Sequence, residues 1–579
     1  MNFNYRKNDN SLLFKNLEDV KLLNVEKIQN YIPVYKKFFD LNENNYDNIN
    51  LNNYYSLKNI TTKKTDNIYD GIIVNEKSIE YEKSIEYEKE VFFKFSPIID
   101  PIKFITNSYD LSHSDLFNLP QYNIEESISE NMYSYNNSAY VDSFFYYLTS
   151  QLLHNYNFMH GTDFYGSFLG IKNDFYFNIA DDIENLHESE IFHKNKNNLF
   201  EITNEYYLNV SNYDSRNYKF PLNIGNDIDD KNILNLSDIS SISDIDNLFI
   251  SNDLSKNIFT PNVLYENNIT VLNKSNKTDE SGSSCSSRSS NTNNSEVDSD
   301  GGPDDESGSD CDSDTDESSV SNSTLSEDEI FIKLFKFPIQ LIALEKCKNT
   351  LDSLFNDDQI SEEELGAFVS QIILILITYQ KLFSFTHNDL HSNNIMYVET
   401  EKQFLYYKYN SKYYKIPTFG KIFKIIDFGR AIYKYKGNLL CSDSYDFKGD
   451  AATLYNFEPY FNNNKPRLEP NLSFDLCRLG CSLYDYFVDD LDDIKNITSP
   501  IIKIIIDWCY DDKKRNILYK NNGSERYPDF KLYKMIARTV TNHKPDMVIQ
   551  NVFFEQYIIS KKKLNKKHKI FNIDDIEIS

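Results

Sequence analysis

Two polar motifs in the second half of the chain carry the residue types that phosphoryl chemistry needs. One reads T-H-N-D-L-H-S-N-N over 386–394, and the other reads I-D-F-G over 426–429. They place a candidate base, Asp389, an amide, Asn394, and a carboxylate, Asp427, in this order. Transfer of a phosphoryl group spreads negative charge over its oxygens, so a protein has mainly to supply positioned cations and orientation. The pattern predicts that Asp427 and Asn394 bind one Mg²⁺ each and that Asp389 receives the proton of an acceptor hydroxyl.

The segments around these motifs have the apolar patterns of strands and helices. The runs 395–398 and 422–426 predict two short strands, so that a hairpin carries both metal ligands. Upstream, apolar residues recur with helical spacing over 362–385, which predicts a long helix that delivers the chain to the first motif. A shorter helix is expected to open at 349–352.

At these residues the chain resembles the eukaryotic-type protein kinase superfamily and, more narrowly, the serine/threonine kinases of giant, mimivirus-like DNA viruses. The motifs that carry the resemblance are H-x-D-L-x-x-x-N, beginning at His387, and D-F-G, completed by Phe428 and Gly429. The resemblance implies an α+β, two-lobed protein-kinase-like fold, with a small β-rich N-lobe and a larger helical C-lobe. Its domain limits would be 1–344 for the N-lobe, and 345–579 for the C-lobe with catalytic loop 387–394, D-F-G at 427–429 and C-terminal helices.

A third stretch, 473–480, is similar to the D-x-W-S-x-G start of the large C-lobe helix in this family. The resemblance implies that Asp475 braces the backbone of the catalytic loop. Gly480 also fits the pattern, whereas Cys477 and Arg478 stand where the family has Trp and Ser.

A strand pattern at 90–95 embeds Lys94 among large apolar residues. Strand alternation alone favours an ordinary outward lysine, but its position before the other motifs matches the lysine that binds nucleotide phosphates in the family. The family pairs this lysine with a Glu from the next helix, yet the candidate helix 139–154 has only one acid, Asp142. Asp142 either pairs with Lys94 or simply suits the first turn of a helix. Rival partners for the lysine are Glu125, Glu126 and Glu130.

The glycine-rich loop that covers phosphates in this family is absent, because Gly71 is the only glycine in the first 160 residues. Residues 56–59 are instead the expected turn between two strands. The stretches 160–169 and 337–344 resemble the next strands of the N-lobe. The hinge between lobes would follow, and its backbone is expected to bind adenine at Leu344, Glu345, Lys346 and Cys347.

An insertion over 173–330 is expected to interrupt the N-lobe. Its tract 281–329 is dominated by Ser, Asp, Glu, Gly and Asn, and 296–329 holds 14 acids without Lys or Arg, half of the net charge of −28. Such a composition predicts disorder. The acidic balance argues against a dedicated nucleic-acid or anionic-membrane surface. The insertion is interpreted as a solubilising spacer, with phosphorylation or partner binding as the alternatives.

The remaining sequence, 40% hydrophobic and 15% aromatic over the whole chain, is ample for one large two-lobed domain. Seven cysteines without paired C-x-x-C sets indicate neither zinc nor a disulfide framework, and so a reducing compartment. A viral origin would place the protein in the host cytoplasm or the virion. The longest apolar run, 372–378, predicts a buried helix and no membrane span. The basic stretch 561–569 predicts a solvated terminal helix.

Two departures from the family concern regulation and substrate. Asn388 replaces the arginine that pairs with a phosphorylated activation segment in many relatives, which predicts activity without that phosphorylation. His391 stands where serine/threonine kinases usually place a lysine, and it also resembles the loop of aminoglycoside and choline kinases.

The sequence therefore predicts a serine/threonine protein kinase that uses ATP and Mg²⁺. The alternatives are a small-molecule phosphotransferase and a pseudokinase scaffold that displays the acidic insertion.

Overall fold

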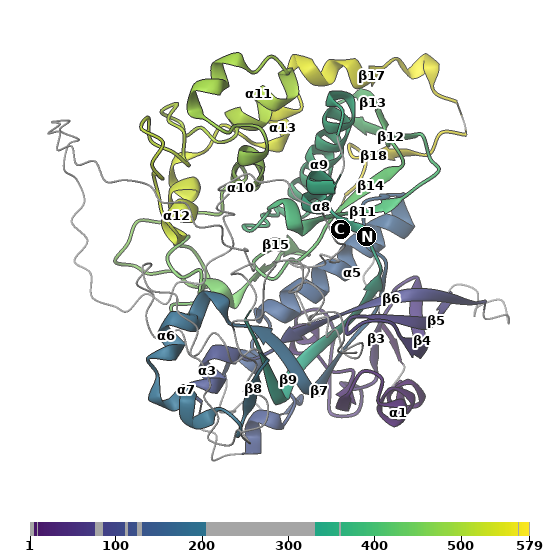
Figure 1. Cartoon of the computed structure of the whole chain (residues 1–579). Helices are drawn as coiled ribbons and strands as arrows, with labels where there is room; N and C mark the ends of the chain where they lie inside the picture. Colours follow the sequence, from purple (N-terminus) through teal and green to yellow (C-terminus); the bar gives the residue numbers. More distant parts are fainter. Residues whose placement is uncertain are drawn as a thin grey trace, which may run out of the picture.

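A curled antiparallel sheet forms one half of the molecule and a group of helices forms the other (Figure 1). The computed structural model describes residues 5–7, 10–75, 85–109, 114–123, 130–203, 330–357, 360–565 and 567–577. In the main sheet the strands follow the order β2-β7-β9-β6-β5-β4, and β8 pairs with β9. The strands are β2 (Val25–Gln29), β4 (Tyr55–Lys63), β5 (Ile68–Asn75), β6 (Glu86–Pro97), β7 (Phe164–Asn178), β8 (Phe200–Ile202) and β9 (Phe331–Glu345).

Helix α5 (Ser138–Tyr156) packs against β7 and β9 and lies between the sheet and the other helices (Figure 1). The Asn137 side chain caps the helix by accepting a hydrogen bond from the amide of Ala139 (3.1 Å). Every residue from Ala139 to Leu152 is buried. A helix that is buried on all sides must satisfy its polar side chains within the protein, and this explains why its polar residues engage both halves of the molecule.

The second half centres on α9 (Glu362–Phe383), which begins with a capping box between Ser361 and Glu364. Of the described residues, only this helix has the length and mean hydropathy of a membrane span, and 83% of its most apolar window is buried inside the protein. A core helix passes the same test, so this is weak evidence for a span. The other helices of this half are α8 (Leu351–Asp357), α10 (Phe474–Leu483), α11 (Pro500–Asp507), α12 (Phe530–Thr539) and α13 (Pro545–Val548). Those near the sheet are α1 (Ser11–Val20), α3 (Pro101–Ile105), α4 (Glu130–Tyr133), α6 (Ile183–His187) and α7 (Glu190–Asn195).

Four small sheets complete the fold. The strand order β10-β11-β14 includes an antiparallel pair in which Ile395 lies opposite Ile425. A hairpin of β12 and β13 separates β11 from β14 along the chain, and the C-terminal strands β17 and β18 flank that hairpin. The bounds are β1 (Tyr5–Lys7), β3 (Ile49–Leu51), β10 (Asn349–Thr350), β11 (Ile395–Glu399), β12 (Phe404–Tyr409), β13 (Lys412–Pro417), β14 (Lys421–Ile425), β15 (Ile432–Tyr435), β16 (Asn438–Cys441), β17 (Ile558–Ile559) and β18 (Ile570–Asn572).

The mixed α and β content and several individual elements agree with the sequence. The two strands around the motifs are confirmed as β11 and β14, and the long helix as α9, which ends at Phe383. The turn expected at 56–59 is wrong: these residues lie inside β4, and the turn to β5 comes at 64–67. The helix expected at 561–569 is also wrong, because Lys561–Lys563 form only a 3-10 turn.

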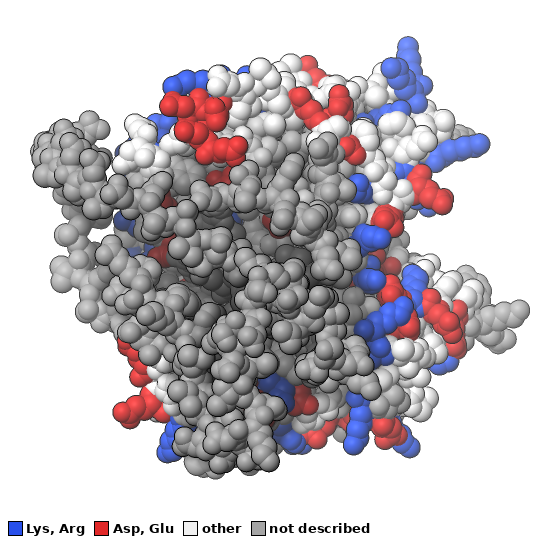
Figure 2. Space-filling model, in the orientation of Figure 1, with Lys and Arg blue, Asp and Glu red and all other residues white. Residues whose placement is uncertain are grey.

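Part of the expected insertion 173–330 is ordered structure. Strand β7 continues to Asn178, and α6, α7 and β8 follow before residue 204. The acidic tract 281–329 lies outside the described residues. On the face shown in Figure 2, the described surface mixes Lys and Arg with Asp and Glu.

Candidate active site

Lys94 of β6 lies buried between two carboxylates. Its Nζ is 2.8 Å from Oδ2 of Asp142 on α5 and 2.9 Å from Oδ1 of Asp427, and the lysine side chain is only 3% exposed. Burial disfavours the charged amine, but the two carboxylates outweigh it and raise the pKa of Lys94. Burial also raises the pKa of Asp142, to about 6 despite the neighbouring ammonium. Of the two readings of Asp142, the structure shows the one in which it pairs with Lys94.

Helix α5 contacts the D-F-G segment through two residues one helical turn apart. The amide of Phe428 donates to Oδ1 of Asp142 (2.6 Å), and the amide of Asp427 donates to the hydroxyl of Tyr146 (2.9 Å). Residues at i and i+4 share a helix face, so α5 presents Asp142 and Tyr146 to the same segment. Tyr146 was not predicted as a site residue, although its spacing of four residues from Asp142 is that of one helix face. Side chains of the rivals Glu125, Glu126 and Glu130 lie outside the described residues.

Asp475 holds the backbone of the loop at 387–394. Its carboxylate accepts hydrogen bonds from the amides of His387 and Asn388, each at 2.9 Å, and it is completely buried in the first turn of α10. The His387 ring joins this loop to the D-F-G segment, because Nε2 lies 2.8 Å from the carbonyl oxygen of Ile426. The structure therefore places Asp475 where the resemblance expects it.

The Asp389 carboxylate is held on both sides. Oδ1 accepts a hydrogen bond from the hydroxyl of Tyr533 (2.9 Å), and Oδ2 lies 3.4 Å from Nη1 of Arg430. Burial raises the pKa of Asp389, but neighbouring positive charges, Arg430 first among them, and the Tyr533 hydrogen bond outweigh burial and lower it to about 2. The group is therefore an ionised carboxylate near neutral pH, as a proton acceptor has to be.

The Asn394 side chain offers an oxygen to a ligand. Its Nδ2 donates to the Asp389 carbonyl (2.9 Å) and to Nε2 of His391 (3.0 Å). Its Oδ1 is buried and has no hydrogen-bond partner in the described part of the structure. The Ile426 amide donates to the Asn394 carbonyl (3.0 Å), which places this residue beside the segment that carries Asp427.

These oxygens fit a magnesium ion. A buried amide oxygen and a carboxylate are hard ligands of the type that Mg²⁺ takes. The described residues hold no cluster of three or more His, Cys, Asp and Glu side chains suited to a metal. Asn394 and Asp427 would therefore hold Mg²⁺ together with the phosphates of a nucleotide, as is common for this ion.

The expected hinge residues lie at the end of β9, with their side chains already engaged. Glu345 pairs with buried Lys424 of β14 and accepts the amide of Asp163 (2.9 Å). Lys346 pairs with Glu90 (2.8 Å). Leu344 and Cys347 are buried, and burial raises the pKa of the Cys347 thiol to about 12. A nucleotide here would meet backbone groups rather than the charged side chains.

The turn between β4 and β5 is fastened to β6 next to Lys94. Asn67 exchanges two hydrogen bonds with the backbone of Phe93: its Nδ2 donates to the carbonyl (2.9 Å), and its own carbonyl accepts from the amide (2.7 Å). The Thr65 hydroxyl accepts from the amide of Ile68 (3.1 Å) and shapes the turn. Side-chain hydrogen bonds thus stabilise this turn without glycine.

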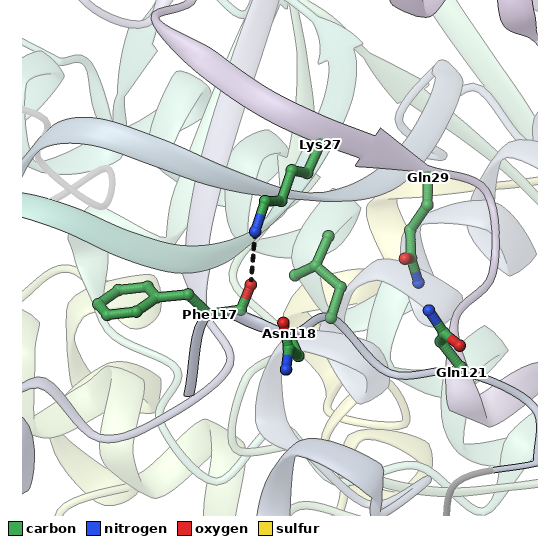
Figure 3. A pocket seen from close by; sticks show the side chains of 6 residues that line it. Lys27, Gln29, Phe117, Asn118 and Gln121 are labelled. Atoms are coloured by element: carbon green, nitrogen blue, oxygen red, sulfur yellow. Dashed lines mark hydrogen bonds between the residues drawn. The ribbon is translucent and has the colours of Figure 1, made fainter. Parts of the chain in front are cut away.

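A cavity of about 440 Å³ lies elsewhere, beside β2 (Figure 3). Strands β7 and β9 separate β2 from β6 in the sheet, so this cavity is distinct from the Lys94 site. Two polar side chains that line the cavity already make hydrogen bonds within the protein: Lys27 Nζ donates to the carbonyl of Phe117 (3.4 Å), and Gln29 donates to the carbonyl of Pro120 (2.7 Å). None of the residues predicted to do chemistry lines it. Lining residues are Lys27, Gln29, Phe117, Asn118, Leu119 and Gln121.

The structure thus joins residues that are far apart in the sequence into one site. Lys94 contacts both Asp142 and Asp427 directly, while Asp389 and Asn394 come from the adjoining loop. Neither a model of a known protein family nor a curated protein sequence matches this chain significantly.

Proposed function

We propose that this chain is a serine/threonine protein kinase with a two-lobed kinase fold, which transfers the γ-phosphoryl group of ATP with the help of Mg²⁺. The observation that carries the proposal is the buried contact of Lys94 with Asp142 and Asp427, next to an ionised Asp389. Each of these groups has a separate role in phosphoryl transfer. The sheet would be the small lobe, and the helices from α8 onward would be the large lobe.

Each residue has a role that follows from its surroundings. Lys94 would bind phosphate oxygens of ATP, with Asp142 keeping its ammonium in place. Asn394 and Asp427 would hold Mg²⁺, which when bound offsets the negative charge on the phosphates. Asp389 would orient the acceptor hydroxyl and take its proton at Oδ2, since Tyr533 occupies Oδ1.

A small-molecule phosphotransferase is the second candidate, because His391 stands where serine/threonine kinases usually place a lysine. The His391 ring accepts the Asn394 amide (3.0 Å), and burial lowers the pKa of His391 to about 4. His391 is therefore neutral near pH 7 and supports Asn394 rather than offering a positive charge to phosphate. The loop therefore lacks the positive charge that a lysine at this position would supply.

The first test is phosphoryl transfer from labelled ATP, with Mg²⁺, to a generic basic protein. An Asp389→Asn variant should lose about 10²-fold or more in rate, because the base no longer orients the hydroxyl. Asp492→Asn is the matched control, since its side chain is 89% exposed. Label on Ser or Thr that disappears only in the Asp389 variant would support the proposal.

Other outcomes point elsewhere. Transfer to aminoglycosides or choline, with none to protein, would move the assignment to the small-molecule enzyme. Absence of both ATP binding and transfer would overturn catalysis and favour the scaffold.

A further inference from the structure

A buried arginine and a tyrosine from two different helices converge on Asp389. Arg478 of α10 is 1% exposed, and its Nε donates to the hydroxyl of Tyr533 on α12 (3.0 Å). That hydroxyl in turn donates to Oδ1 of Asp389 (2.9 Å). The guanidinium carbon also lies 5.2 Å from the centre of the Tyr533 ring. The packing of α10 against α12 brings these side chains together (Figure 1).

This geometry fixes the direction of the tyrosine proton. A tyrosine hydroxyl has a single proton to donate. When Arg478 donates to the oxygen of Tyr533, that proton is left to point at Asp389. A hydrogen bond to an ionised carboxylate is among the stronger ones in proteins, so it opposes rotation of the Asp389 side chain. Oδ2 is then the oxygen that faces Arg430 at the longer distance of 3.4 Å.

Two residues near Asp389 differ from the family that the sequence resembles. Arg478 stands where the resembling family has serine, and His391 stands where it has lysine. Two guanidinium groups approach Asp389: Arg430 lies 3.4 Å from Oδ2, and Arg478 reaches Oδ1 through the Tyr533 hydroxyl. Burying a guanidinium is costly unless it has partners, and Tyr533 is one partner of Arg478.

We propose that Tyr533, oriented by Arg478, is a positioning residue that holds Asp389 with Oδ2 directed to the acceptor hydroxyl. This inference rests on the proposed kinase function. It assigns to Tyr533 of α12, 144 residues beyond Asp389 in the sequence, a part in the transfer step. Tyr533 touches neither nucleotide nor acceptor in this account and acts only through Asp389.

Tyr533→Phe is the decisive variant, because it removes the hydroxyl and keeps the ring that packs against Phe474 and Phe530. Tyr519→Phe is the matched control: the Tyr519 hydroxyl likewise donates to an aspartate, Asp485, at 3.0 Å. We expect Tyr533→Phe to lower kcat for protein phosphorylation about tenfold or more, since small misplacement of a catalytic group is costly. The Kd for ATP should stay close to that of the control.

Arg478→Met adds a second measurement. If Arg478 acts through Tyr533, the double variant should lose little more kcat than Tyr533→Phe alone. If Arg478→Met does not fold, the comparison between the two tyrosine variants still decides.

The outcomes separate the inference from the function beneath it. Active wild-type protein with equal kcat in Tyr533→Phe and Tyr519→Phe overturns the positioning role and leaves the kinase proposal intact. A higher KM for the acceptor at unchanged kcat overturns it too, because that loss is one of binding. Wild-type protein that transfers phosphate to no acceptor overturns both.

Discussion

At the scale of single residues, the Lys94 site is a balance between one buried cation and two carboxylates. Lys94 contacts both Asp142 and Asp427, and Asp142 is also buried. Charges taken out of water are stable only when paired, and breaking such a group exposes the cost of the charge that remains. The stability of the protein and the proposed binding of phosphate therefore depend on the same lysine.

Lys94→Met should destabilise the protein by about 3–5 kcal/mol, because it leaves two carboxylates without their cation. Adding Asp142→Asn should restore at least about 1 kcal/mol, since one uncompensated charge is gone. The asparagine oxygen can still accept the amide of Phe428, which Asp142 accepts at 2.6 Å. Urea unfolding of the wild type, both single variants and the double variant measures this. Strictly additive losses would contradict the prediction.

Residues with a fixed motif spacing were predictable from the sequence, and residues that meet across the fold were not. Asp389, Asn394 and Asp427 could be named because their spacing is specific. Asp142 remained one of two readings, since a helix gives the face of a residue but not its partner. Tyr533 was missed altogether, because only the packing of α12 on α10 brings it to Asp389.

At the scale of elements, neutral hydrogen bonds connect the segment after D-F-G to the loop at 387–394. The Tyr455 hydroxyl donates to Oδ1 of Asn388 (2.8 Å), and Nδ2 of Asn388 donates to the carbonyl of Arg430 (3.1 Å). The Tyr445 hydroxyl donates to the same carbonyl (2.6 Å). These bonds hold the segment without a phosphate group, in line with the activity expected without phosphorylation.

Thr453→Glu should change the rate of phosphorylation by less than about twofold, because Asn388 cannot form an ion pair with an added negative charge. Arg538, which donates to the Thr453 carbonyl (2.9 Å), belongs to α12 and not to the loop at 387–394. Thr453 is exposed, so the added charge stays in water. Ser442 is a poor site for the same test, since it is fully buried and its hydroxyl accepts the amide of Ser444 (3.2 Å). Steady-state kinetics on a basic protein measures the effect. A strong gain in rate from Thr453→Glu would refute the prediction. As a comparison, Tyr455→Phe should lower the rate, because it removes the hydrogen bond to Asn388.

The segment before β7 contains a buried histidine that makes stability depend on pH. His160 donates from Nδ1 to the Phe423 carbonyl (2.6 Å), and Nε2 lies 2.5 Å from the Tyr407 hydroxyl. Burial and the charge of Lys424 lower the pKa of His160 from 6.5 to about 3. The unfolded imidazole therefore binds a proton at a higher pH than the folded one does. Its stabilising contribution is fully present above pH 6.5 and is lost as the pH falls toward 3.

When the pH is lowered from 7 to 5, protonation of His160 in the unfolded chain should reduce the free energy of unfolding of the wild type by about 2 kcal/mol. His160→Gln can still donate and accept hydrogen bonds but does not titrate. Its free energy of unfolding should fall by about 2 kcal/mol less over the same range. Denaturant unfolding at both pH values gives the difference, which cancels the titration of other groups. Equal pH dependence in the two proteins would show that His160 is protonated as readily when folded.

Element types followed from apolar periodicity more reliably than element ends did. The period of 3.6 residues identified α9, but its last turn ended where Ser384 adopts a left-handed conformation (φ 50°). The turn at 56–59 was misplaced because β4 contains register shifts between Leu57 and Asn59 and between Ile60 and Thr62. Such irregularities in a strand have no simple sequence signal, and Ser-Leu-Lys-Asn is polar enough to suggest a turn.

At the scale of the whole molecule, segments that are far apart in the sequence pair with one another. The C-terminal strand β18 runs parallel to β12, and Lys381 of α9 donates to the carbonyl of Asp574 (2.9 Å). Strand pairing between residues so far apart leaves no local pattern in the sequence. The sequence therefore predicted one large domain but not the pairing of its C-terminal strand with β12. The two ends of the expected insertion meet in the same way. The amide of Thr203 donates to the carbonyl of Phe331 (2.9 Å), and the Ile179 amide donates to that of Ile330 (2.8 Å).

Because these ends already touch, replacing residues 204–329 by a Gly-Ser linker of about four residues should leave the fold intact. Closing a loop roughly thirtyfold shorter costs about 3 kcal/mol less in chain entropy, so the melting temperature should stay level or rise. A matched deletion that begins at 199 also removes β8, whose Phe200 is completely buried against the core. That variant should melt at a lower temperature, because the core loses an aromatic side chain. Calorimetry on both deletions and the full chain distinguishes them, and a marked loss of stability in the shorter deletion would show that residues 204–329 contribute to the folded core.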